Sequence, residues 1–215
     1  MNDEEGGAER FGAAAQAAEW DSRYNESDDR VWSGRPNGRL VAEVADMPAG
    51  RALEVGCGEG ADAIWLAQRG WAVTAIDISE VAVNRARNAA ALADVTVEWL
   101  CGDVRRAALP PASFDLVSMQ YPALPKTTGR SIGHVLREAV PTGGLLLAVF
   151  HDLDAAHREH MIARGIDPGD YVGADDLVAM ISNDFAIVTH DVRPRIDPPP
   201  GAAHIADVVV AARRR

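Results

Sequence analysis

The stretch that most constrains the fold is residues 53–60, which read Leu-Glu-Val-Gly-Cys-Gly-Glu-Gly. A short apolar run at residues 52–55 leads into it, and residues 61–68 show apolar residues at helical spacing. This order predicts a strand that turns sharply through a glycine loop into a helix. Because glycine has no Cβ, the loop can adopt positive φ and let a ligand lie against its backbone. The stretch therefore indicates a nucleotide-binding loop, although glycine spacing alone is a weak signal.

The same alternation of strand and helix continues along the chain. We expect strands at residues 52–55, 72–76, 95–100, 114–119 and 145–150. Helices are expected at residues 39–46, 61–69, 80–93 and 132–140, the first capped by Asn37 and the third by Ser79. This alternation implies a parallel, doubly wound sheet.

The C-terminal part of the chain follows a different pattern. A helix that opens at Asp175 or Asp176 precedes strands at residues 186–192 and 205–211. Residues 193–204 include three consecutive prolines and are too few for a helical crossover, so we expect an antiparallel hairpin. The predicted fold class is α/β, a Rossmann-like, doubly wound sheet of seven strands, mostly parallel with an antiparallel C-terminal pair.

Two segments precede the first strand. Residues 1–16 are rich in Gly, Ala and Glu, and we expect a mobile tail with a nascent helix from Ala13 onward. Residues 17–37 contain two tryptophans and a tyrosine in a polar context, so this segment either docks on the domain or covers a bound ligand. A chain of 215 residues suffices for one core, so residues 17–215 are expected to form a single domain.

Composition excludes several classes of function. The formal net charge is −11, and the only basic run is the terminal Arg213-Arg214-Arg215, so a nucleic-acid substrate is not expected. Two cysteines give no disulfide framework, which favours reduced thiols in the cytoplasm. We find no signal-peptide pattern and no apolar run near the roughly 20 residues that span a bilayer. A soluble, cytoplasmic protein without a membrane partner is expected.

Polar residues or glycines follow four of the predicted strands. They are residues 56–60, Asp77, Asp103 and the pair Gln120-Tyr121. Ligands of open parallel sheets bind outside the carboxyl ends of the strands, so these residues should converge on one crevice. The Asp77 carboxylate suits a ribose diol, because it can accept hydrogen bonds from both hydroxyls. Asp103 can accept from an adenine amino group, and Val104 offers the ring an apolar wall.

A nicotinamide dinucleotide is the competing ligand, because Gly56, Gly58 and Ala61 also satisfy the dinucleotide fingerprint. Glu54 argues against it, since its negative charge beside the loop would repel a pyrophosphate and attract the amino group of a methionine-type cofactor. About fifty residues precede the first strand, and the terminal hairpin is unusual for dinucleotide domains.

Together these residues resemble the class I S-adenosylmethionine-dependent methyltransferases. The resemblance rests on the glycine loop with Glu54, on Asp77-Ile78, on Gly102-Asp103-Val104 and on residues 114–117, and it covers residues 37–150. It implies S-adenosylmethionine as cofactor. In this family Glu54 and the backbone of Gly56, Cys57, Gly58 and Gly60 would face the methionine moiety. Asp77 would hold the ribose, Asp103 the adenine amino group, and Ile78 and Val104 would sandwich the adenine.

A narrower likeness lies in the N-terminal segment. Trp20-Asp21 and Arg23-Tyr24, followed by Trp32 and Pro36-Asn37, are similar to the opening of the thiopurine and tellurite-resistance methyltransferases. In that group the segment folds over the cofactor and its first aromatic residue contacts it. The resemblance implies this role for residues 17–37 and for Trp20, with Arg23 and Tyr24 as weaker candidates.

The acceptor site should lie where the fourth and fifth strands end. Gln120 either contacts cofactor or substrate or makes a strand-end hydrogen bond, and Tyr121 either lines the acceptor pocket or packs in the core. His151 ends the fifth strand, where a general base would sit, since histidine titrates near neutral pH. Arg193 and Arg195 either meet an anionic acceptor or are solvated. No metal site is expected, because His151, His157 and His160 lack accompanying cysteines.

The sequence therefore favours S-adenosylmethionine-dependent methyl transfer to a small molecule by in-line displacement. The acceptor classes left open are a thiol, a chalcogen oxyanion and a natural product. A non-catalytic S-adenosylmethionine-binding regulatory protein is the alternative, and a nicotinamide-dependent oxidoreductase is a remote one.

Overall fold

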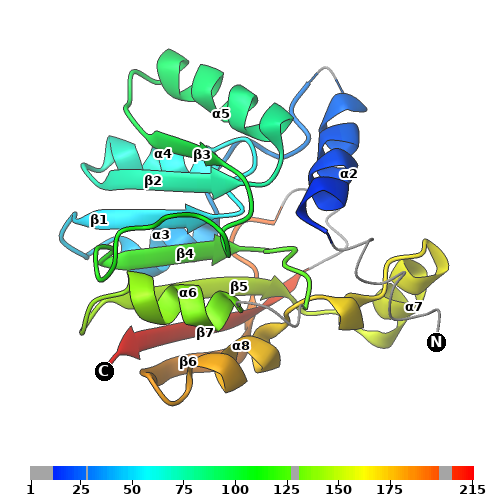
Figure 1. Cartoon of the computed structure of the whole chain (residues 1–215). Coiled ribbons are helices and arrows are strands. Elements are labelled where there is room, and N and C mark those ends of the chain that lie inside the picture. Colours follow the sequence, from blue (N-terminus) through cyan, green and yellow to red (C-terminus); the bar gives the residue numbers. More distant parts are fainter. Residues whose placement is uncertain (1–11, 28, 127–130, 199–204) are drawn as a thin grey trace.

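One seven-stranded sheet forms the centre of the protein (Figure 1). The computed structural model describes residues 12–27, 29–126, 131–198 and 205–215. The strand order is β3-β2-β1-β4-β5-β7-β6. The strands are β1 (Arg51–Val55), β2 (Ala72–Asp77), β3 (Glu98–Cys101), β4 (Leu116–Gln120), β5 (Leu145–His151), β6 (Phe185–Pro194) and β7 (Ala206–Arg214).

The pairing of the strands confirms the predicted fold class. Strands β1 to β5 pair in parallel, whereas β7 runs antiparallel to both β5 and β6. The predicted hairpin is therefore present, and its strands are longer than the apolar runs at residues 186–192 and 205–211 indicated. The order of strands reverses between β1 and β4, which is where ligands of doubly wound sheets bind.

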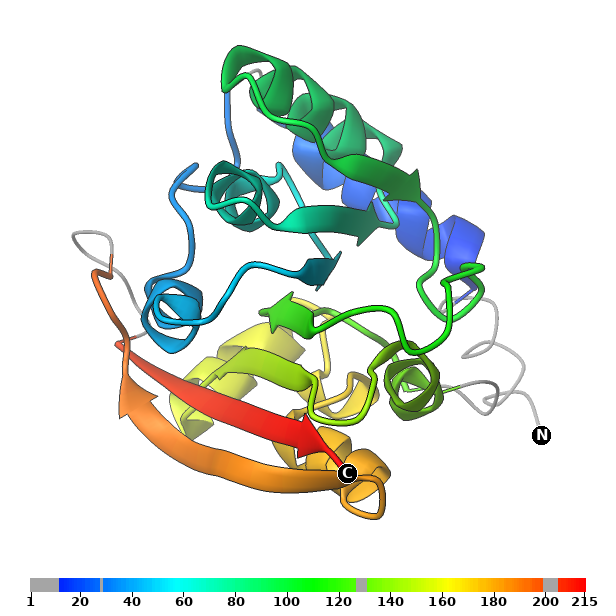
Figure 2. The same ribbon diagram turned by 90° about the vertical axis from the view of Figure 1, so that its left-hand side faces the viewer.

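Helices cover both faces of this sheet (Figure 2). Helices α3 and α4 pack their apolar residues on one face, where α5 also lies against α4, and α6 and α8 pack on the other. The helices are α2 (Ala13–Asn25), α3 (Gly38–Val44), α4 (Ala61–Gln68), α5 (Glu80–Leu92), α6 (Ile132–Ala139), α7 (Ala155–Ala163), α8 (Ala174–Ile181) and the short 3-10 helix η1 (Pro168–Asp170).

Two of the predicted helix caps are confirmed. Asn37 Oδ1 accepts from the Arg39 N–H at 2.8 Å, and Ser79 Oγ accepts from the Ala82 N–H at 3.1 Å. Each side chain satisfies one of the N–H groups that have no partner within the helix. Helix α8 begins at Ala174, and Asp176 caps it by accepting from the Gly173 N–H at 2.9 Å.

The start of β3 differs from the sequence-based prediction. The strand begins at Glu98 rather than at residue 95, because the Val95 N–H donates to Ala90 O at the end of α5. Helix α2 begins at Ala13, the residue from which we expected a nascent helix. The rest of that expectation, residues 1–11, lies outside the described residues.

Helices α2 and α7 lie beyond the ends to which the parallel strands point (Figure 1). They stand on opposite sides of the place where the strand order reverses. Within the described part of the chain, no helix is long and apolar enough to cross a membrane.

Candidate functional site

A cavity of about 1780 Å³ lies at the carboxyl ends of the strands. It brings together nine of the eleven predicted cofactor residues and both predicted catalytic residues, namely Trp20, Gly56, Cys57, Gly58, Asp77, Ile78, Asp103, Val104, Gln120, Tyr121 and His151. Pockets for a single drug-sized ligand usually hold roughly 300–1,000 Å³. The cavity therefore has room for two small ligands side by side.

The three glycines of the loop have different roles. All have positive φ, at +71° for Gly56, +50° for Gly58 and +85° for Gly60. A Cβ on Gly56 would meet nothing within 4 Å, whereas one on Gly60 would lie 2.8 Å from Trp99 Cη2 and 2.9 Å from Ala86 Cβ. Gly60 does not line the cavity, and it serves the packing of α4 against α5. Its contact with the cofactor stays a prediction.

Glu54 also stands apart from the cavity. It is 1% exposed and is not among the residues that line the cavity, and its role toward the methionine moiety stays a prediction. Its carboxyl group hydrogen-bonds Ser118, and its Oε2 atom is buried with no hydrogen-bond partner. Burial, together with the charge of Asp62, raises the pKa of Glu54 well above its ordinary value.

Asp62 is a cavity residue that the sequence analysis missed. It lies in the first turn of α4, lines the cavity and accepts from the Asn37 N–H at 2.6 Å. Burial raises the pKa of Asp62 to about 6, and the bond from Asn37 opposes this shift. Its position just after the glycine loop was visible in the sequence, but its burial depends on the loop at residues 31–37.

Asp77 ties the glycine loop to the end of β2. Its Oδ2 atom accepts from the Gly58 N–H at 2.8 Å and its Oδ1 atom from the Ser79 N–H at 2.9 Å. Burial raises the pKa of Asp77, and these two bonds work in the opposite direction. Each carboxylate oxygen keeps a second lone pair, so Asp77 can still accept hydrogen bonds from a diol.

Asp103 has an unforeseen partner in Arg105. The guanidinium binds both carboxylate oxygens, with Nε 2.8 Å from Oδ1 and Nη2 2.8 Å from Oδ2, and the Arg105 N–H adds a third contact at 2.9 Å. Burial alone would raise the pKa of Asp103, but Arg105 brings it below its ordinary value. These bonds occupy most of the lone pairs intended for the adenine amino group. Val104 is 4% exposed and lines the cavity as an apolar wall.

The N-terminal segment packs directly over the glycine loop. The Trp32 Nε1–H donates to the Tyr24 hydroxyl at 2.9 Å, and a Cβ on Gly58 would lie 3.0 Å from that hydroxyl oxygen. The Arg23 guanidinium carbon stands 5.1 Å from the Trp20 ring centroid and 5.3 Å from that of Trp32. The segment is therefore docked on the domain and also lines the cavity.

A buried ion pair anchors this segment. The Glu59 carboxylate accepts from the Val31 N–H at 3.2 Å and from the Trp32 N–H at 3.0 Å. Arg85 binds Glu59 at 3.0 Å and donates to the carbonyl oxygens of Tyr24, Ser27 and Asp29. These contacts hold both the end of α2 and the loop that follows it.

A second anchor joins α2 to the loop after β2. Asp21 Oδ1 accepts from the Ser79 hydroxyl at 2.6 Å and from the Val81 N–H at 3.2 Å. The covering segment is thus linked to Asp77 through the residue that caps α5.

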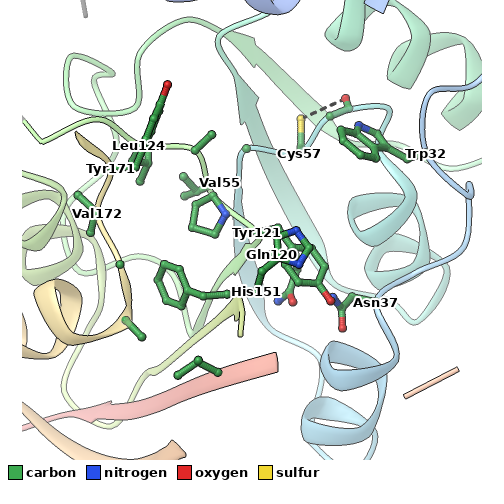
Figure 3. Close-up of a pocket in the computed structure, with 18 of the residues that line it drawn as sticks. Trp32, Asn37, Val55, Cys57, Gln120, Tyr121, Leu124, His151, Tyr171 and Val172 are labelled. Atoms are coloured by element: carbon green, nitrogen blue, oxygen red, sulfur yellow. Dashed lines mark hydrogen bonds between the residues drawn. The ribbon is translucent and has the colours of Figure 1, made fainter. Parts of the chain in front are cut away.

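Tyr121 is the centre of the acceptor end. Its φ is +52°, a conformation that bulky residues rarely adopt and that concentrates at functional sites. Its hydroxyl donates to Asp207 Oδ1 at 2.9 Å, and its ring stacks on His151 at 4.2 Å between centroids with 13° between planes. Figure 3 shows both rings beside Gln120 and Asn37. Burial and the Asp207 charge raise the pKa of Tyr121, which argues against a role as general base.

Gln120 makes the strand-end hydrogen bond and still lines the cavity. Its Nε2 donates to Ser118 Oγ at 2.9 Å, whereas its Oε1 is buried with no hydrogen-bond partner. Apolar side chains, among them Leu124, Tyr171 and Val172, line another side of the cavity (Figure 3).

The remaining histidines and cysteines do not form a metal centre in the described part of the chain. No group of three or more His, Cys, Asp or Glu side chains there could hold a metal ion. His157 Nδ1 pairs with Asp154 Oδ1 at 2.8 Å. Cys57 is buried and Cys101 exposed, and both are free thiols.

Comparison with known proteins agrees with this geometry. Residues 52–142 match a family model described as a methyltransferase domain. Uncharacterised methyltransferases of Mycobacterium bovis and Mycobacterium tuberculosis are 43% identical over 91 residues, which cover 41% of this chain and 45% of theirs. A thiopurine S-methyltransferase of Gluconobacter oxydans is 32% identical over 76 residues, or 34% of each chain. The chain thus spans less than half the length of these curated relatives.

Solved structures share the whole fold. A protein from work on the conversion of a disulfide bond into a thioacetal group during echinomycin biosynthesis has a TM-score of 0.74 at 24% identity, covering 93% of this chain and 92% of that one. The N-methyltransferase NodS of Bradyrhizobium japonicum, solved with S-adenosylhomocysteine, has a TM-score of 0.68 at 19% identity, covering 91% and 97%. These solved structures show that the chain has the fold of such methyltransferases, and the match to the methyltransferase-domain model is confined to residues 52–142.

Proposed function

We propose that this protein transfers a methyl group from S-adenosylmethionine to a small-molecule acceptor. The observation that carries the proposal is the set of acids around the glycine loop. Asp62 and Asp77 line the cavity there, and Glu54 lies buried behind it. Such a site repels the pyrophosphate of a dinucleotide and attracts a ligand with cationic groups.

The residues at this end of the cavity fit S-adenosylmethionine. Gln120 Oε1, on the cavity, is a buried acceptor without a hydrogen-bond partner, and the Gln120 amide, like the Glu54 carboxyl group buried behind the cavity, hydrogen-bonds Ser118. An unsatisfied buried acceptor is costly, and an ammonium group can supply the missing donors. Asp77 would hold the ribose, and Ile78 and Val104 would enclose the adenine.

Methyl transfer requires alignment and exclusion of water more than covalent help from the protein. When bound, S-adenosylmethionine supplies an electrophilic methyl group on a sulfonium. The covering segment at residues 17–37, with Trp20 on the cavity, would shield that methyl group from water. Positioning of this kind can contribute about 7–11 kcal/mol to lowering the barrier.

His151 is the residue that can accept the proton released by the acceptor. It ends β5, lines the cavity and is held in a stack against Tyr121. Tyr121 is in turn fixed by Asp207, so it acts as a positioning residue for the His151 ring. A thiolate acceptor would need no base, whereas an oxygen or nitrogen acceptor would use His151.

The cavity and the charge of the chain favour a small molecule as the acceptor. A volume of about 1780 Å³ accommodates a cofactor and one small acceptor, and the net charge of −11 disfavours a nucleic acid. The partial match to a thiopurine S-methyltransferase supports the thiopurine and tellurite-resistance branch, with a thiol, a chalcogen oxyanion or a natural product as acceptor.

Turnover of S-adenosylmethionine tests this proposal. The protein is incubated with the cofactor and a panel of thiol, phenol, amine and oxyanion acceptors, and S-adenosylhomocysteine is quantified by mass spectrometry. We expect acceptor-dependent product with at least one class, and its loss in a control without acceptor. Binding of the cofactor without turnover on any acceptor would favour a regulatory protein instead.

A further inference from the structure

Arg195 occupies a distinctive position at the acceptor end of the cavity. It follows β6, its N–H donates to Ile205 O at 2.9 Å, and its side chain lines the cavity half-buried. The guanidinium carbon lies 5.1 Å from the centroid of the Tyr121 ring. The same ring stacks on the His151 imidazole.

No carboxylate of the described residues neutralises the charge of Arg195. Among the described residues, none places a carboxylate oxygen within 4.0 Å of its guanidinium. Two residues earlier, within β6, Arg193 pairs with Glu43 at 3.1 Å and with Asp191 at 2.8 Å. In a chain of net charge −11, an unpaired half-buried cation facing a ligand cavity is a site for an anion.

The platform beneath this cation is rigid. Tyr121 is fixed by its bond to Asp207, by its N–H donating to Val149 O at 2.8 Å and by its stack on His151. Arg195 and His151 therefore both lie within 5.1 Å of one ring centroid. A carboxylate bound to the Arg195 guanidinium would therefore lie beside a fixed aromatic ring at the acceptor end of the cavity.

We propose that the acceptor carries a carboxylate that binds Arg195, joined to an apolar or aromatic body. This inference rests on the proposed function and names its substrate class. A guanidinium fork matches the planar, singly charged carboxylate through two parallel hydrogen bonds. Apolar side chains nearby, Ile196, Val192 and Phe150, line the same cavity and suit the body of such a molecule.

Binding of a matched acid and amide tests the proposal. Fluorine NMR measures the affinity of 4-fluorobenzoate and 4-fluorobenzamide for the protein saturated with S-adenosylhomocysteine, in the wild type, Arg195→Gln and Arg193→Gln. The wild type should bind the acid at least tenfold more tightly than the amide, about 1.4 kcal/mol. Arg195→Gln should remove this preference and leave the amide affinity unchanged, whereas Arg193→Gln should alter neither.

The proposal would be overturned if the wild type bound acid and amide with equal affinity. It would also be overturned if neither compound bound with a dissociation constant below about 10 mM. An equal loss of acid binding in Arg193→Gln would overturn it as well, because the effect would then be a general one of charge. Calorimetry of S-adenosylhomocysteine on the same samples separates the two levels. If S-adenosylhomocysteine binds but the protein does not prefer the acid to the amide, only the proposed acceptor class is wrong. If S-adenosylhomocysteine does not bind, the proposed function fails.

Discussion

The different roles of Gly56 and Gly60 lead to opposite consequences when each is replaced by alanine. Both glycines have positive φ, and holding an L-residue in this conformation costs roughly 1–2 kcal/mol. At Gly56 the new Cβ meets nothing within 4 Å of protein, so the loss of stability should end there. At Gly60 the methyl would lie 2.8 Å from Trp99 and 2.9 Å from Ala86, and overpacking adds about 1–3 kcal/mol.

Urea denaturation and calorimetry together measure this contrast. We expect Gly60→Ala to lower the free energy of unfolding by about 2–5 kcal/mol and Gly56→Ala by about 1–2 kcal/mol. The affinity for S-adenosylhomocysteine should change in the reverse order, because only Gly56 lines the cavity. If Gly60→Ala were the milder change in stability, or the one that weakened the nucleoside more, the assignment of Gly60 to helix packing would be refuted.

Three further predictions follow from the same contacts. The pKa of Asp62 is raised to about 6 in the folded state, so its contribution to the free energy of unfolding is fully present below its ordinary pKa and is lost as the pH rises through about 6. This loss amounts to about 3 kcal/mol, and Asp62→Asn should flatten it in urea titrations from pH 4 to 7. Arg85→Met should raise hydrogen exchange in residues 13–32 and weaken S-adenosylhomocysteine binding, whereas the exposed Arg87→Met should do neither. His151→Asn should lower kcat with an oxygen or nitrogen acceptor about 10²–10⁴-fold while leaving nucleoside affinity unchanged, and an unaltered kcat would remove it as the base.

The fold was predictable because its signals are local. The caps at Asn37 and Ser79 and the turn at the glycine loop depend on neighbours in the sequence, and the structure places each where the pattern indicated. The hairpin of β6 and β7 followed from the short proline-rich connection. Only its length was underestimated, because the pairing of the two strands continues past the apolar runs to Arg193 in β6 and to Arg213 and Arg214 in β7.

The chemistry of the site was less predictable, since it depends on contacts between distant residues. Nothing local distinguishes the packing role of Gly60 from the ligand role of Gly56; the difference lies in Trp99 and Ala86. Asp207 reads in the sequence as one acid in an apolar strand, yet it is 1% exposed and fixes Tyr121 from 86 residues away.

The most direct test of the central claim is the calorimetric affinity for S-adenosylhomocysteine in the wild type and in Asp77→Asn. We expect a dissociation constant below about 100 μM for the wild type and at least a tenfold increase for the variant. Asp46→Asn, at an exposed position away from the cavity, should bind as the wild type does. Absence of binding by the wild type, or binding of NADH in its place, would contradict the assignment of this crevice to S-adenosylmethionine.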